Sequence, residues 1–264
     1  MARILSALVL IPIALALVIY ASPPFFLLAI GILGTACLYE YFRIIRAMGL
    51  PPQTWYGYAA FWILLISLRF SSIPESAVLS ALIIAGFLVA LWSKGSMREG
   101  MLGFMGTLTG VFYLVFCLYP AIPIRFDFEA GLQWIFILLA VIWAGDTGAL
   151  AAGKILGRTP FAPVISPKKT YEGAIGGLLA GVVAAAVLQH FWFKDLPLFH
   201  VILLSVVLGV FGQLGDLAES MLKRAAGTKD SSQLIPGHGG VLDRIDSLLF
   251  ALPVLYLYLE WVHP

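Results

Sequence analysis

The sequence predicts an all-α, polytopic integral membrane protein with about nine transmembrane helices and a cytoplasmic N-terminus. Hydrophobic residues make up 61% of the 264-residue chain and charged residues 11%, whereas soluble domains are about half apolar and about one quarter charged. Apolar runs long enough to cross a bilayer recur along the whole chain. Lys and Arg gather at alternate ends of these runs, which is typical of a chain that crosses a membrane repeatedly.

Nine apolar runs are long enough to span a bilayer, and the sequence defines their ends to within several residues. They lie at 4–20, 25–42, 54–70, 74–92, 101–123, 131–153, 172–193, 197–219 and 243–262. The first run could also be read as a signal peptide, but it is longer than the roughly 7–15 apolar residues usual there. We interpret residues 1–264 as a single transmembrane domain. Its N-terminal spans occupy 1–130, and the half that carries the candidate functional motifs occupies 131–264.

The distribution of positive charge sets the orientation, because Lys and Arg are retained on the cytoplasmic side. With nine spans and the N-terminus inside, the side opposite the cytoplasm receives only Arg69, Arg125 and Lys194. The loops 154–171 and 220–243 then share the cytoplasmic face. The cytoplasmic set is Arg3, Arg43, Arg46, Lys94, Arg98, Lys154, Arg158, Lys168, Lys169, Lys223, Arg224, Lys229 and Arg244.

The charge and cysteine content argue against a nucleic-acid-binding protein and against a protein built on disulfides or a cysteine metal site. A net charge of +2, with no basic face interleaved with aromatic residues, argues against nucleic acid as a partner. The only cysteines, Cys37 and Cys117, both lie within apolar runs. We therefore expect neither a disulfide framework nor a thiolate metal site.

Acidic residues at the cytoplasmic ends of the spans indicate a functional site. A charged side chain at bilayer depth costs about 3 kcal/mol or more on insertion scales. The acids of this kind are Asp146, Asp216, Glu219, Asp243 and Asp246, with Glu40 a weaker member. Asp216 with Glu219, and Asp243 with Asp246, are spaced i, i+3 and share one helix face. Because like charges repel, a hard cation with oxygen ligands is the simplest hypothesis for what lies between them.

Structural explanations compete with this hypothesis one residue at a time. Asp243 would serve as a helix cap, Asp246 would pair with Arg244 or Lys229, and Lys223 with its neighbour would be membrane anchors. Taken singly, each explanation is about as good as the functional one. None explains why acids from separate spans lie at one membrane level beside a His-Gly-Gly turn and a basic cluster.

The basic residues and glycines fit a polyphosphate ligand. Lys and Arg give charge-assisted hydrogen bonds to phosphate oxygens, and the turn 236–240 has glycines that let backbone N–H groups approach an anion. Lys168 and Lys169 lead into a Gly/Ala-rich span, and they are either lipid-headgroup anchors or phosphate ligands. The glycines of that span are interpreted as positions of tight helix packing.

The run 220–246 resembles the signature of the phosphatidate cytidylyltransferase (CDP-diacylglycerol synthase) family. That signature reads S-x-hydrophobic-K-R, K-D, H-G-G and D-R-hydrophobic-D, and every one of its positions is filled here. Two further stretches are similar to the same family, 146–157 and 166–173. One departure is Leu150, where many relatives carry Tyr, which puts a peripheral contact in doubt. The resemblance covers the second half densely, and the first half matches only as a set of spans.

The resemblance implies transfer of a cytidylyl group from CTP to phosphatidic acid, with Mg²⁺, in the cytoplasmic membrane. The candidate catalytic residues are Asp216, Lys223, Arg224, His238, Asp243 and Asp246. The candidate metal ligands, for one or two ions, are Asp146, Asp216, Asp243 and Asp246. The candidate phosphate-binding residues are Lys168, Lys169, Ser220, Lys229, Gly239, Gly240 and Arg244. Ser220 and His238 are expected to orient phosphate or a ligand carboxylate.

Two other functions stay open at the level of sequence. A CDP-alcohol phosphotransferase would combine a lipid, a metal and CDP, but its D-G-x2-A-R and G-x3-D-x3-D motif is not found in the chain. A secondary transporter would place its site near the bilayer midplane with repeat symmetry, and no repeat is visible. Membrane lipids are expected around all the spans, and the exposed faces of the first five are candidates for a homodimer contact.

Overall fold

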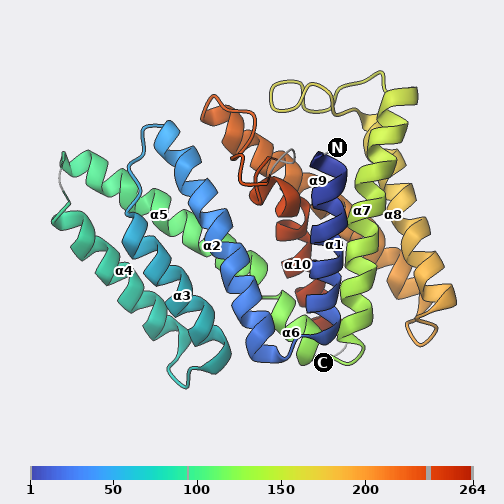
Figure 1. The fold of residues 1–264 in the computed structure, drawn as a ribbon, viewed down its shortest axis with the longest axis horizontal. Helices are drawn as coiled ribbons and strands as arrows, with labels where there is room; N and C mark the ends of the chain where they lie inside the picture. The colour runs from blue at the N-terminus through green and yellow to red at the C-terminus, as the bar shows by residue number, and fades with distance from the viewer. Residues whose placement is uncertain (1, 94, 236–238, 263–264) are drawn as a thin grey trace. The chain divides into compact units, whose positions relative to one another are not determined.

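A computed structural model describes residues 2–93, 95–235 and 239–262, and it is all-α in these ranges (Figure 1). The only extended pairings there are two isolated bridges, Pro160 with Thr170 and Ile235 with Gly239. The all-α prediction is therefore confirmed. The helices are α1 (Ala2–Tyr20), α2 (Pro23–Ala47), α3 (Thr54–Phe70), α4 (Glu75–Leu91), α5 (Met97–Leu118), α6 (Ala121–Phe126), α7 (Gly131–Leu156), α8 (Tyr171–Phe191), α9 (Leu198–Ala225) and α10 (Leu242–Val262).

Six helical segments are long and apolar enough to cross a membrane, which supports a multi-pass membrane protein. They are 23–47, 97–126, 131–156, 171–191, 198–225 and 242–262. The other predicted spans correspond to α1, α3 and α4. The last two are 17 residues each, or about 25 Å at 1.5 Å per residue, a little under the roughly 30 Å of a hydrocarbon core.

The chain divides into two compact units, and α9 and α10 contribute residues to both. Unit 1 comprises residues 1–119 and 222–243. In it α5 packs against α2, α3 and α4. Phe42, Phe61 and Leu114 are among its fully buried side chains. Helix approach is close enough that a Cβ on Gly57 would lie 2.4 Å from the Phe42 ring.

Unit 2 comprises residues 120–221 and 244–264. Its main contact is between α7 and α8, which lie side by side (Figure 1). Small residues make this possible. A Cβ on Gly148 would lie 2.4 Å from the Ala180 Cβ, and one on Gly176 would lie 2.3 Å from the Ala152 Cβ. The glycines of α8 thus serve close helix packing, as expected for membrane helices.

A proline interrupts the predicted span 101–123. Helix α5 ends at Leu118, and α6 begins after Pro120. Proline cannot donate the next backbone hydrogen bond and clashes with the preceding turn. The Tyr119-Pro120 break is also where unit 1 gives way to unit 2.

Candidate functional site

One polar cluster lies in unit 2, around Asp216 of α9. Lys169 Nζ lies 2.6 Å from Asp216 Oδ2, and both side chains are partly exposed. The hydroxyl of Ser220, one turn further along α9, lies 3.4 Å from Asp216 Oδ1. Asp146 of α7 is within electrostatic range of Asp216, Lys169 and Arg244. The structure therefore places Lys169 and Ser220 in contact with Asp216, with Asp146 and Arg244 within electrostatic range of this cluster.

Lys169 lies in the loop that precedes α8, and backbone contacts across this loop fix its position. Its carbonyl oxygen accepts from the Phe161 N–H at 3.1 Å. The next residue, Thr170, pairs with Pro160 and caps α8 by accepting from the Gly173 N–H at 3.1 Å. A Thr N-cap of this kind satisfies one of the free N–H groups of the first helical turn. Lys168, by contrast, is exposed.

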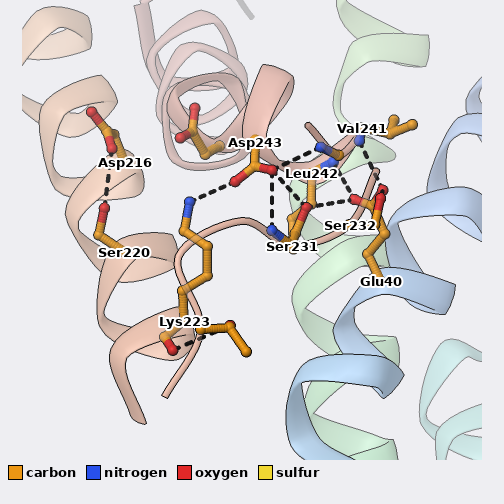
Figure 2. Close-up of polar contacts among 12 residues, drawn as sticks. Glu40, Asp216, Ser220, Lys223, Ser231, Ser232, Val241, Leu242 and Asp243 are labelled. Atoms are coloured by element: carbon orange, nitrogen blue, oxygen red, sulfur yellow. Dashed lines mark hydrogen bonds and ion pairs between the residues drawn. The ribbon is translucent and has the colours of Figure 1, made fainter. Parts of the chain in front are cut away.

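A second polar cluster lies in unit 1, where the end of α9 meets the start of α10 (Figure 2). Lys223 Nζ lies 2.5 Å from Asp243 Oδ1, and the two side chains are only 12% and 8% exposed. The other Asp243 oxygen accepts from the Ser231 hydroxyl at 2.8 Å and from the Gly240 N–H at 2.8 Å. The Ser231 N–H also donates to it, at 3.2 Å. Asp243 thus organises the loop before α10 while it pairs with Lys223.

Glu40 of α2 joins this second cluster (Figure 2). Its side chain is fully buried, and it accepts from Ser231, Ser232 and the N–H groups of Val241 and Leu242. The sequence marked Glu40 only as a weaker member of the acids at span ends. Its position near the cytoplasmic end of a predicted span was the sole signal, because its partners lie 191 to 202 residues further along the chain.

The remaining predicted residues, together with Arg244 of the Asp216 cluster, lie closer to solvent or outside these contacts. Arg224 is exposed and donates to the Thr228 carbonyl at 3.2 Å. Lys229 and Arg244 are exposed. Asp246 Oδ1 accepts from the Ser247 N–H at 2.6 Å. His238 lies outside the described residues.

The glycine turn has a definite backbone requirement. Gly239 has φ +81°, a left-handed conformation that favours glycine. The N–H of Gly240 meets the Asp243 carboxylate, and those of Val241 and Leu242 meet Glu40. The anions that these backbone groups contact here are carboxylates of the chain itself.

The donor chemistry of unit 2 fits a magnesium ion. Within residues 2–93, 95–235 and 239–262, no group of three or more His, Cys, Asp or Glu side chains is arranged to hold a metal. Mg²⁺, however, usually keeps several waters and is held by one or two carboxylates together with substrate phosphates. Asp146 and Asp216 supply two such carboxylates.

Comparison with known proteins gives matches along nearly the whole chain. A family model described as the cytidylyltransferase family matches residues 1–262. The phosphatidate cytidylyltransferase of Bacillus subtilis is 37% identical over 266 residues, covering 97% of this chain and 96% of that protein. The protein of the same name from Synechocystis sp. is 34% identical over 298 residues and covers 99% and 97%. That of Staphylococcus haemolyticus is 46% identical over 129 residues, about half of each chain.

Proposed function

This chain belongs to the cytidylyltransferase family, and we propose that it transfers the cytidylyl group of CTP to phosphatidic acid. The products are CDP-diacylglycerol and pyrophosphate. The observation that carries this function is the similarity to phosphatidate cytidylyltransferases over 97% and 99% of the chain. That similarity includes the stretch in which Lys223 pairs with Asp243.

The reaction is a phosphoryl-type substitution between two anions. An oxygen of the phosphatidate phosphate attacks the α-phosphorus of CTP, and the bond from the α-phosphorus to the oxygen bridging to the β-phosphate breaks. The nucleophile is already an anion at neutral pH, so it needs no strong base. The barrier is electrostatic, and positioned cationic groups lower it by aligning the reactants and stabilising the leaving pyrophosphate.

We assign the carboxylates to the metal. Asp216, Asp243 and Asp246, with Asp146 as a further ligand, would hold Mg²⁺ as one or two ions. The oxygen donors of Asp146 and Asp216 support this, since Mg²⁺ prefers oxygen ligands. When bound, Mg²⁺ would supply positive charge that offsets the repulsion between the two anionic substrates.

The basic residues are assigned to the phosphates. Lys169 pairs with Asp216 in this structure, and Lys223 pairs with Asp243, so each lysine has a carboxylate beside it that fixes its position. From these positions both would also donate to phosphate oxygens when substrate binds, because an ammonium with three donors serves more than one acceptor. Lys168, Arg224, Lys229 and Arg244 would add positive charge, and Ser220 and His238 would orient phosphate or carboxylate oxygens. Gly239 and Gly240 would shape the turn beside them.

The site is proposed to open to the cytoplasm and to the inner leaflet. Nine spans with the N-terminus inside put thirteen of the 16 Lys and Arg residues on the cytoplasmic side, leaving Arg69, Arg125 and Lys194 outside. A water-soluble nucleotide and a lipid would then reach the same residues from different directions. The cytoplasmic membrane is the corresponding location.

Purified protein tests this function. Incubation with CTP, phosphatidic acid in mixed micelles and Mg²⁺ should release pyrophosphate, and omission of any one of the three should abolish release. Pyrophosphate release without phosphatidic acid would indicate a different acceptor. Release of CMP from CDP-diacylglycerol and an alcohol would indicate a CDP-alcohol phosphotransferase, and counterflow of substrate without chemistry would indicate a transporter.

A further inference from the structure

Glu40 uses both of its carboxylate oxygens to hold the loop before α10. Oε1 accepts from the Ser232 hydroxyl and from the Val241 N–H at 2.9 Å. Oε2 accepts from the Ser231 hydroxyl at 3.0 Å and from the Leu242 N–H at 2.7 Å. The side chain is 0% exposed. Two segments far apart in the sequence, both within unit 1, are thereby joined at one side chain.

The charge of Glu40 suits this position. The first N–H groups of a helix have no partner inside the helix, and the positive end of the helix dipole favours an anion there. Val241 and Leu242 carry N–H groups at the start of α10. The Ser232 hydroxyl adds a third donor, and the Ser231 hydroxyl is a fourth that Glu40 shares with Asp243, so these neutral donors offset the cost of burying the carboxylate.

Ser231 connects Glu40 to Asp243. Its hydroxyl oxygen lies 3.0 Å from Glu40 Oε2 and 2.8 Å from Asp243 Oδ2. A hydroxyl carries a single proton, so both carboxylates compete for the same donor. Asp243 in turn contacts Lys223 through its other oxygen. A continuous chain of polar contacts therefore runs from Glu40 through Ser231 and Asp243 to Lys223 (Figure 2).

Gly240 shows how closely the loop approaches Glu40. A Cβ at this position would lie 1.8 Å from the Ser231 hydroxyl oxygen, 2.6 Å from Glu40 Oε2 and 2.7 Å from Oε1. No side chain fits there while the contacts persist. The second glycine of the His-Gly-Gly turn is thus required by the contact between Glu40 and the loop.

We propose that Glu40 is a positioning residue for the cytidylyl transfer. It fixes the segments 231–232 and 241–242, and through Ser231 it fixes the orientation of Asp243 and Lys223. In this role Glu40 touches no substrate. The inference rests on the proposed function, because Asp243 and Lys223 are the groups that meet metal and phosphate.

The test compares Glu40→Gln with Glu40→Asp. Glutamine has the same size but only one acceptor oxygen, and its NH₂ group would face donors. Outer-shell partners of a site typically contribute about 10- to 100-fold to activity, so kcat of Glu40→Gln should fall by about that factor with the KM for CTP within about twofold. Glu40→Asp keeps the charge and should recover part of kcat. Glu99→Gln is the matched control, because Glu99 also accepts at a helix start in unit 1 but lies outside this chain of contacts.

A double-mutant cycle separates positioning from general stability. Ser231→Ala removes the connecting hydroxyl, so adding it to Glu40→Gln should cost little beyond the larger single loss. Thermal unfolding gives the fraction of each variant that is folded, and kcat is calculated for that fraction. A wild-type kcat in Glu40→Gln would overturn the proposal. It would also be overturned if the kcat losses of the two single variants multiplied in the double variant. If Glu40→Gln does not fold, the same cycle is measured with Glu40→Asp and Ser231→Ala, singly and combined, and the same criteria apply. Product formation by the wild type and by Glu99→Gln reports on the proposed function independently.

Discussion

Lys223 Nζ lies 2.5 Å from Asp243 Oδ1, and both side chains are nearly buried. Lys223 is in the last turn of α9, and Asp243 is in the first turn of α10. Removing one partner of a buried ion pair typically costs about 3–5 kcal/mol, because the other charge stays buried. This contact therefore ties the two ends of the intervening loop together within unit 1.

Asp243→Asn should abolish turnover while the chain stays folded in detergent. The amide oxygen of asparagine still accepts from Ser231 and Gly240, so the loop keeps its hydrogen bonds. The negative charge beside Lys223 is lost, and turnover should fall by about 100-fold or more. The measurement is pyrophosphate release together with size-exclusion elution and thermal unfolding. Wild-type activity in this variant would remove Asp243 from the reaction.

Asp216→Asn should raise the Mg²⁺ concentration needed for half-maximal turnover by about 10- to 100-fold. The variant loses one of the carboxylates that we assign to the metal, the one that pairs with Lys169. Asp195→Asn is the control, since Asp195 is an exposed loop residue of the same unit. A Mg²⁺ titration of both variants decides. An unchanged midpoint for Asp216→Asn would show that Asp216 does not hold the metal.

Gly240→Ala should destabilise the protein by about 1–3 kcal/mol, the usual cost of forcing atoms into a packed site. Its new Cβ would lie 1.8 Å from Ser231 and under 3 Å from both oxygens of Glu40. Gly106→Ala is the matched control, because its Cβ would meet only the flexible tip of Ile45 at 3.2 Å. Thermal unfolding of the two variants gives the comparison. Equal stability of Gly240→Ala and the wild type would mean that the loop does not pack as described.

The orientation of the chain predicts which loops accept a reagent from each side of the membrane. In a background with Cys37 and Cys117 replaced by alanine, cysteines at Lys154 and Lys229 should react only after the membrane is permeabilised. A cysteine at Lys194 should react with an impermeant maleimide in intact cells. Labelling of the Lys154 or Lys229 position in intact cells would reverse the proposed topology.

The sequence predicts the helices well, because apolar length is a local property. The nine predicted runs coincide with α1 to α5 and α7 to α10 to within several residues. The break after Tyr119 was missed, because the apolar run continues through Pro120 and Pro123 and hydropathy alone does not register a lost backbone donor. The small residues of α8 were correctly interpreted as packing positions.

The sequence singles out the candidate site residues, but it predicts only some of the contacts that they make in the structure. Spacing along one helix shows that Asp243 and Asp246 share a face, yet it does not show that Asp243 reaches back to Gly240 and Ser231. The role of Glu40 could not be predicted from the local sequence pattern, because it depends on the packing of α2 against a loop about 200 residues further along the chain. The interpretation of Asp243 as a structural residue of α10 and its interpretation as a functional residue are compatible, since one carboxylate oxygen serves the loop and the other contacts Lys223.

The most direct test of the central claim follows the label of radioactive CTP. With phosphatidic acid and Mg²⁺, [α-³²P]CTP should transfer its label to a chloroform-soluble lipid, while label from [γ-³²P]CTP should appear only in pyrophosphate. Transfer of the γ-label to lipid, or retention of the α-label in the aqueous phase, would contradict cytidylyl transfer by this protein.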